Sequence, residues 1–182
     1  FIIKYLNFLN KSSLINIVAI TNSVKNLFIK KYHVKASKIT VLPSGSSIRI
    51  NLIPKLSYNK RLKIGYFGAI SSSKGINTLI KLSKIDKKND YYIYGGSNLE
   101  ISKIKKRNTN KNLFLKESLP YAGLSKIMLN MDILTIPYTK RVTSAGGVDD
   151  ISKYTSPLKL FDYLAVGKII IASDLKVLRE VI

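Results

Sequence analysis

Short, mainly apolar runs alternate along this chain with segments of helical periodicity, and this alternation restricts the possible folds more than any other feature. Runs typical of buried strands lie at 15–20, 39–42, 62–67, 91–94, 113–115, 132–137 and 168–173. Helices are predicted between them at 22–32, after 75, at 99–107, 123–131 and 157–165, and from 175 onward. Strands and helices in this order predict an α/β fold whose doubly wound parallel sheet carries helices on both faces.

Two helices allow more detailed predictions. Asn22 or Ser23 is expected to cap the first helix, because a short polar side chain there can accept a hydrogen bond from a free backbone amide. The helix after residue 75 is expected to turn one apolar face toward the sheet. That face contains Ile76, Leu79, Ile80 and Leu82.

The pattern breaks once, at residues 46–60, where Pro, Ser and Asn occur without clear periodicity and a linker is predicted. Residues 1–45 are then the end of a truncated N-terminal domain, and its sheet is expected to include strands from outside the chain. Residues 61–182 are predicted to form a C-terminal domain that is truncated at its own end. A first residue other than Met and a last segment typical of an unfinished helix favour a fragment of a longer protein.

Composition excludes several kinds of chemistry. Of the 182 residues, 46% are hydrophobic and 23% are charged, which is typical of a globular domain. There is no Cys, so disulfides, thiolate metal sites and cysteine catalysis are excluded. The single His33 cannot form a multi-histidine metal site, and no motif of a Ser-His-Asp triad is present.

The net charge of +21 is typical of proteins that bind nucleic acid or anionic membranes. Only five of the 31 basic residues are Arg, however, and readers of nucleic acid usually use Arg for phosphate and guanine contacts. Lys accumulates here with Ile and Asn, which favours a bias toward A- and T-rich codons over a dedicated polyanion surface. We therefore expect no specific nucleic-acid partner.

No membrane-spanning segment is predicted, because Lys residues interrupt every apolar run before the roughly 20 residues that a bilayer requires. Residues 1–20 also lack the small-residue cleavage site of a signal peptide. The expected location is the cytoplasm, with peripheral contact at the inner face of the membrane as an open alternative.

The strongest candidate site begins at Ser156. Ser156 is a suitable N-cap and Pro157 suits the first helical position, so the amides of Leu158 and Lys159 are predicted to form an anion site. Asp162 lies five residues beyond Pro157, which is about 7.5 Å along the helix axis at about 1.5 Å per residue. That spacing suits a nucleotide with its diphosphate at the helix start and its ribose at Asp162, although a solvated carboxylate fits the spacing as well.

A second candidate is the turn that begins at Gly68, directly after the strand at 62–67. It contains three Ser residues and ends in Lys74 and Gly75, which can hold phosphate oxygens at a helix start. The turn is neither a Walker loop nor a dinucleotide-binding fingerprint, so alone it is a weak signal. The long loop at 138–155 suits either a substrate lid or a solvated loop.

The order of these motifs resembles GT-B glycosyltransferases of family 4, over nearly the whole chain from about residue 15. The matching segments are 20–23 with 38–45, Tyr66-Phe67-Gly68 with Lys74-Gly75, 92–96, 132–138, and Ser156 to Tyr163 continuing to Asp174. The resemblance implies two Rossmann-like domains facing each other across a cleft. This chain would supply the C-terminal, donor-binding half.

The resemblance also implies roles for individual residues. The donor site would comprise Gly68, Lys74, Gly75, Phe114, Leu115, Ser156, Leu158, Lys159 and Asp162. Among these, Gly68, Lys74 and the amides of Leu158 and Lys159 would hold the diphosphate. Asp162 would stand where the family usually has Glu and bind the ribose, and backbone near Phe114 and Leu115 would meet the base.

The implied activity is transfer of a sugar from a nucleotide-diphosphate-sugar to a glycan or lipid-linked acceptor, with retention of configuration and without an obligatory metal or other cofactor. The catalytic residues are not assigned, and the fragment alone is expected to be inactive. Two residues depart from the family pattern: Ala69 replaces an arginine, and Tyr154 replaces an acidic residue that reaches the donor sugar. These departures leave a catalytically inert nucleotide-binding subunit as an alternative, and the charge leaves a nonspecific polyanion-binding domain as another.

Overall fold

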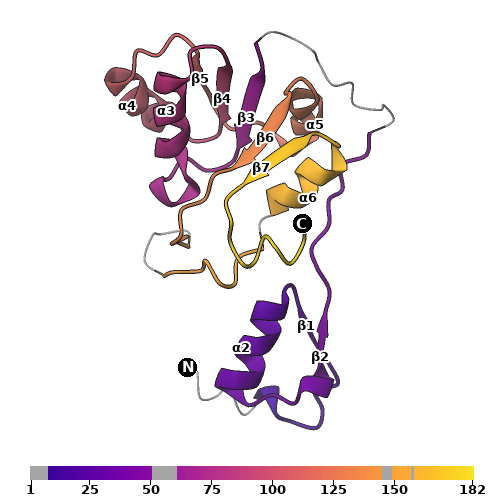
Figure 1. The fold of residues 1–182 in the computed structure, drawn as a ribbon. Helices are drawn as coiled ribbons and strands as arrows, with labels where there is room; N and C mark the ends of the chain where they lie inside the picture. The colour runs from indigo at the N-terminus through magenta and orange to yellow at the C-terminus, as the bar shows by residue number, and fades with distance from the viewer. Residues whose placement is uncertain (1–7, 51–60, 145–148, 157) are drawn as a thin grey trace.

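The computed structural model describes residues 8–50, 61–144, 149–156 and 158–182. Their strands form two separate sheets (Figure 1). The first has two parallel strands, β1 (Ile17–Ala19) and β2 (Ile39–Val41). The second has five strands, and all of its neighbouring pairs are parallel. The predicted α/β fold with a doubly wound parallel sheet is confirmed.

The two-stranded sheet packs against α2 (Asn22–Tyr32), and a short 3-10 helix, η1 (Ala36–Lys38), precedes β2. The predicted cap is wrong by one residue, since Thr21 caps α2 by accepting a hydrogen bond from the Val24 amide at 3.1 Å. The amides of Asn22 and Ser23 instead donate to the carboxylate of Glu180, at 2.7 and 3.2 Å. An acidic side chain from far along the sequence thus accepts hydrogen bonds from backbone amides that have no partner within the helix.

The first strand is less buried than predicted. Ala19 is buried, whereas the Val18 side chain is 60% exposed. The physical reason is that alternate side chains of a strand point to opposite faces. Among the described elements, α2 packs on this two-stranded sheet, so the side chains turned away from α2 remain open.

The five-stranded sheet has the order β5-β4-β3-β6-β7. Its strands are β3 (Lys63–Phe67), β4 (Asp90–Tyr94), β5 (Leu113–Lys116), β6 (Ile133–Ile136) and β7 (Ile169–Ala172). The chain builds outward from β3 in one direction through β4 to β5, and then in the other through β6 to β7. The loops that leave β3 and β6 therefore diverge, which creates a crevice at the carboxyl ends of the strands.

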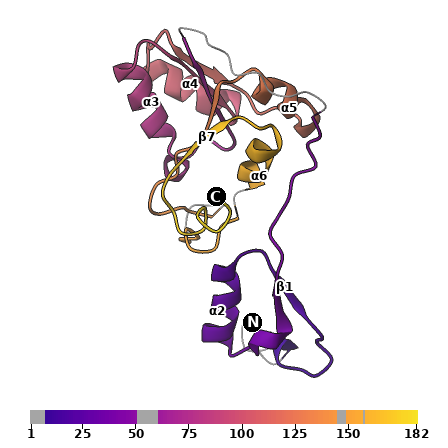
Figure 2. The same cartoon turned by 45° about the vertical axis from the view of Figure 1, so that its right-hand side comes forward.

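Helices cover both faces of this sheet, as Figures 1 and 2 show from two directions. On one face lie α3 (Ile76–Ile85) and α4 (Asn98–Arg107), with the 3-10 turn η2 (Ser72–Lys74) before α3. On the other lie α5 (Tyr121–Leu129) and α6 (Leu158–Ala165). Each face has its own apolar core: one unites α3 and α4 with the side chains of Tyr66 and Ile93, and the other unites α5 and α6 with Phe67 and Leu134.

Two sequence predictions fail within this sheet. Leu82 is 42% exposed, so it does not belong to the apolar face of α3. The helix predicted from residue 175 is instead a series of hydrogen-bonded turns over 176–181. There the Leu175 carbonyl accepts bonds from both Leu178 and Arg179, so no regular helical ladder forms, while Val177 and Leu178 are buried in the core. Among the described residues, no helix is both long and apolar enough to span a membrane.

The buried hydroxyl of Tyr163 joins α6 to the end of β3 through a hydrogen bond. It accepts a hydrogen bond from the Phe67 amide at 3.0 Å, and the Tyr163 side chain is fully buried. Replacing Tyr163 with Phe should lower the free energy of unfolding by about 1–3 kcal/mol, because the buried amide loses its partner. Urea denaturation measures this difference. Tyr32→Phe on α2 is a control that should have little effect. Equal stability of Tyr163→Phe and wild type would contradict the stabilising role of the Tyr163 hydroxyl.

Candidate functional site

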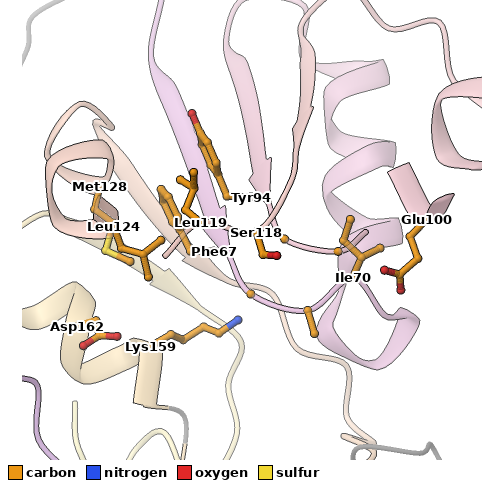
Figure 3. A pocket seen from close by; sticks show the side chains of 14 residues that line it. Phe67, Ile70, Tyr94, Glu100, Ser118, Leu119, Leu124, Met128, Lys159 and Asp162 are labelled. Atoms are coloured by element: carbon orange, nitrogen blue, oxygen red, sulfur yellow. The ribbon is translucent and has the colours of Figure 1, made fainter. Parts of the chain in front are cut away.

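A cavity of about 400 Å³ opens at the carboxyl ends of β3, β4 and β5, and α5 and α6 close its other side (Figure 3). The cavity shares the loop after β3 with the crevice expected from the strand order, but it lies on the β4 side of that loop, and no residue of the loop after β6 lines it. The cavity is lined by Phe67, Gly68, Ala69, Ile70, Tyr94, Gly95, Gly96, Glu100, Ser118, Leu119, Leu124, Met128, Lys159 and Asp162. Apolar side chains form much of the wall, and two side chains of opposite charge, Lys159 and Asp162, enter from the same helix, α6.

Glycine is required where the loops after β3 and β4 meet. The Gly68 amide donates to the Tyr94 carbonyl at 2.8 Å, so the two loops pass in direct contact. Gly68 and Gly95 have φ angles of 143° and 150°, which other residues rarely adopt. A Cβ atom on Gly95 would overlap the Gly68 carbonyl. The floor of the cavity is therefore bare backbone that a ligand can approach closely.

Lys159 extends from the first turn of α6 across the end of β3, as Figure 3 shows. Its Nζ lies 4.0 Å from the centre of the Tyr66 ring and 5.3 Å from that of Tyr138. The same ammonium lies against Gly68, where a Cβ atom would collide with it. Burial lowers the pKa of Lys159 to about 7, and the nearby charge of Lys74 adds to this effect. An anion bound here would restore the charged form.

Lys74, which lies in η2, approaches Tyr138. Its Nζ lies 4.5 Å from the centre of the Tyr138 ring, and burial lowers its pKa. Gly75, with a φ of 78°, follows it in the left-handed region, and a Cβ atom there would overlap the Pro137 carbonyl. The tight packing at Gly75 thus holds Lys74 beside the loop after β6. Two partly desolvated ammonium groups therefore share one aromatic ring, which concentrates positive charge beside the cavity.

Asp162 lies one turn beyond Lys159 on α6. Its Oδ1 accepts hydrogen bonds from Ser46 Oγ at 2.6 Å and from Tyr121 Oη at 2.8 Å. The side chain is partly buried and lines the cavity. A simply solvated carboxylate, the alternative left open by the sequence, does not describe this arrangement, because protein hydroxyls bind the carboxylate directly.

The structure brings some of the predicted donor residues together and places others elsewhere. Gly68, Lys159 and Asp162 line the cavity, whereas Lys74 and Gly75 do not belong to its lining, and Lys74 Nζ lies 4.5 Å from the centre of the Tyr138 ring. Phe114 and Leu115 lie within β5: Phe114 stacks on Tyr92 with ring centres 4.7 Å apart, and Leu115 is buried in the core. Ser118 and Leu119, a few residues further on, line the cavity from the same connection.

The start of α6 differs in part from the expected anion site. Leu158 has a side chain that is 60% exposed, and neither it nor Ser156 belongs to the cavity lining. Ser156 Oγ donates a hydrogen bond to Ser44 Oγ at 3.3 Å. The expected role of Pro157 lies outside the described residues.

The two residues that depart from the family pattern have local backbone roles. The Ala69 carbonyl accepts a hydrogen bond from Tyr66 Oη at 2.9 Å, and Ala69 lines the cavity. The Tyr154 amide donates to the Ile151 carbonyl at 2.9 Å in the loop that leads to α6. Within the described ranges, no group of three or more His, Asp and Glu residues lies close enough together to hold a metal ion.

Sequence reasoning missed the residues that surround the charged groups. Tyr66 and Tyr138 contact the lysines, and Ser46 and Tyr121 contact Asp162. Tyr66 and Tyr138 occur in segments that were recognised as strand ends, so their position at the carboxyl edge was a usable signal. Ser46 carried no such signal, because it lies in a stretch without periodicity.

Comparison with known proteins identifies the fold. No protein-family model matches the sequence, and no curated protein matches it. Among solved structures, Anabaena HepE in complex with UDP-glucose has a TM-score of 0.61 and 16% sequence identity, covering 92% of this chain and 47% of HepE. TarM has a TM-score of 0.65 and 20% identity, and the match covers 95% of this chain and 32% of TarM. A glycosyltransferase from Rickettsia africae ESF-5 has a TM-score of 0.62 and 17% identity, and the match covers 94% of this chain and 48% of that protein.

The chain therefore spans between a third and a half of the length of these proteins. At these identities the likeness establishes the fold, which is that of Rossmann-like GT-B glycosyltransferase domains.

Proposed function

We propose that this chain is the donor-binding half of a GT-B glycosyltransferase resembling family 4. The observation that carries this proposal is the placement of Lys159 and Asp162 on one helix, facing a cavity at the carboxyl ends of β3 and β4. A nucleotide-diphosphate-sugar needs cations for its diphosphate and a hydrogen-bond acceptor for its ribose. The cavity offers both, one helical turn apart.

Each charged residue has a separate task in the proposed reaction. Lys159 and Lys74 bind the diphosphate, and they stabilise the negative charge that develops on it as the sugar departs. Asp162 accepts hydrogen bonds from the ribose hydroxyls. Because the two lysines supply positive charge at the leaving group, the proposed mechanism needs no obligatory metal. Retention of configuration and a glycan or lipid-linked acceptor are also part of the proposal, on the basis of the resemblance to family 4.

We further propose a uridine nucleotide as the donor carrier. HepE, which shares the fold, was solved with UDP-glucose bound. In this chain the base would meet the connection around and after β5, which contains the predicted Phe114 and Leu115 and the cavity residues Ser118 and Leu119. Ser156 and the amides of Leu158 and Lys159 remain proposed contributors at the start of α6.

Calorimetric titration of the chain with UDP, uridine and inorganic pyrophosphate tests the proposal. We expect UDP to bind more tightly than either part alone, because it engages Asp162 and both lysines at once. UDP binding no tighter than pyrophosphate would reject the nucleotide site and favour a general anion site. Binding of UDP by the intact protein without sugar transfer would favour the inert nucleotide-binding subunit, which the replacements at Ala69 and Tyr154 motivate.

The excess of Lys motivates a second element of the proposal, a location in the cytoplasm with peripheral contact to anionic membrane. Each well-placed cation would contribute about 1 kcal/mol to binding at such a surface. We expect the protein to sediment with vesicles containing phosphatidylglycerol, and to be released by salt. Equal partitioning onto neutral vesicles of phosphatidylcholine would contradict the electrostatic contact.

A further inference from the structure

Three protein hydroxyls form a hydrogen-bonded chain that ends on the carboxylate of Asp162. Ser46 Oγ and Tyr121 Oη both donate to Asp162 Oδ1, at 2.6 and 2.8 Å. Ser47 Oγ in turn donates to Tyr121 Oη at 3.3 Å. The three donors come from the segment after β2 and from the first residue of α5, so two distant parts of the sequence meet at this one carboxylate.

The direction of these hydrogen bonds is fixed by the surrounding groups. A serine or tyrosine hydroxyl has a single proton to donate. Ser46 Oγ accepts a hydrogen bond from the Ile48 amide at 3.1 Å, which leaves its proton for Asp162. Tyr121 Oη accepts from Ser47 in the same way. Both protons are therefore directed at the carboxylate, in bonds that the ionised acceptor strengthens.

The segment that provides Ser46 is anchored on both sides of it, although the sequence pattern there predicts a linker. Before Ser46, the Ser44 hydroxyl accepts a hydrogen bond from Ser156 at 3.3 Å. After it, Ile48 and Ile50 pack against the core that contains α5 and α6. The contact with Asp162 therefore belongs to a packed part of the structure.

We propose that Ser46 and Tyr121 are positioning residues of the nucleotide site, which hold the Asp162 carboxylate in the orientation that receives a ribose. This inference rests on the proposed function, because it requires a ligand that carries a ribose. Both protein hydroxyls bind Oδ1, so the ribose hydroxyls are assigned to Oδ2. Since Ser46 lies on the connection between the two sheets, a shift of that connection would change the affinity for the ribose.

The test compares UDP with 2′,3′-dideoxy-UDP, which lacks both ribose hydroxyls. Tyr121→Phe and Ser46→Ala should each weaken UDP binding about tenfold, as expected when a carboxylate loses one orienting hydrogen bond. Neither variant should change the affinity for 2′,3′-dideoxy-UDP, because that ligand does not use Asp162. Tyr91→Phe is the matched control: it removes a tyrosine hydroxyl that donates to Asp86 at 2.9 Å, at the opposite edge of the sheet, and should change neither affinity.

Four results would overturn the inference. Equal losses for both ligands would mean that Ser46 and Tyr121 only support the local structure. Tighter binding of UDP by the variants would mean that their hydroxyls compete with the ribose for Asp162. Failure of wild type to bind UDP would overturn the proposed function as well, whereas UDP binding that depends on Asp162 but not on Ser46 or Tyr121 would overturn this inference alone.

Discussion

Replacing Lys159 with Met should weaken UDP binding by about tenfold to a hundredfold, the loss expected for a hydrogen-bonded ion pair of about 1.5–3 kcal/mol. The substitution keeps an unbranched side chain beside the rings of Tyr66 and Tyr138 and removes the ammonium group with its charge and its N–H donors. Uridine affinity should not change, because uridine carries no phosphate. Lys84→Met, at an exposed position of α3, is the matched control for the loss of one positive charge.

The same lysine should make UDP binding depend on pH. Burial lowers the pKa of Lys159 to about 7 in the empty site, and a bound diphosphate raises this pKa by favouring the ammonium form. UDP affinity should therefore fall as the pH rises above about 7, and binding at pH 8 should take up a proton. Calorimetry in buffers of different ionisation enthalpy measures this uptake. Unchanged proton uptake in Lys159→Met would assign the effect to another group.

Replacing Asp162 with Asn should also weaken UDP binding by about tenfold to a hundredfold, because the charge that strengthens the hydrogen bonds to the ribose is removed. Uridine should lose affinity to a similar degree, and pyrophosphate should lose none. This pattern is the reverse of that expected for Lys159→Met, so calorimetric titration of both variants separates the ribose and phosphate ends of the site. Unchanged uridine affinity in a folded Asp162→Asn variant would reject the ribose assignment.

Much of the fold could be predicted from the sequence because the strands are short apolar runs between polar turns. Each strand of the five-stranded sheet lies within one residue of its predicted bounds, since short apolar runs between polar turns mark strands clearly. The ends of elements were predicted less well where distant groups decide them. Thr21, one residue earlier than predicted, caps α2, and the amides of Asn22 and Ser23 donate to the distant Glu180. The expected last helix is instead a series of turns, in which Val177 and Leu178 are buried.

The candidate site was predictable where its residues are local in sequence. Lys159 and Asp162 share one helix, so spacing alone placed them together. Lys74 and Tyr138 are far apart in the chain, and they meet because Gly75 packs against Pro137 and the Thr139 amide donates to the Ser73 carbonyl. The contact of Ser46 with Asp162 spans 116 residues and comes from a stretch without a pattern, so no local signal could have predicted it.

Mapping the UDP site on the isotope-labelled chain by NMR tests the central claim most directly. A second hollow, at the opposite edge of the sheet, provides an internal comparison, because it is also basic and includes Arg61, Lys87 and Lys111. The account predicts that UDP shifts the amide signals of Gly68, Gly95 and Ser118 and leaves those of the second hollow unchanged. Shifts confined to the second hollow, or no shifts at saturating UDP, would contradict a nucleotide site at the carboxyl ends of β3 and β4.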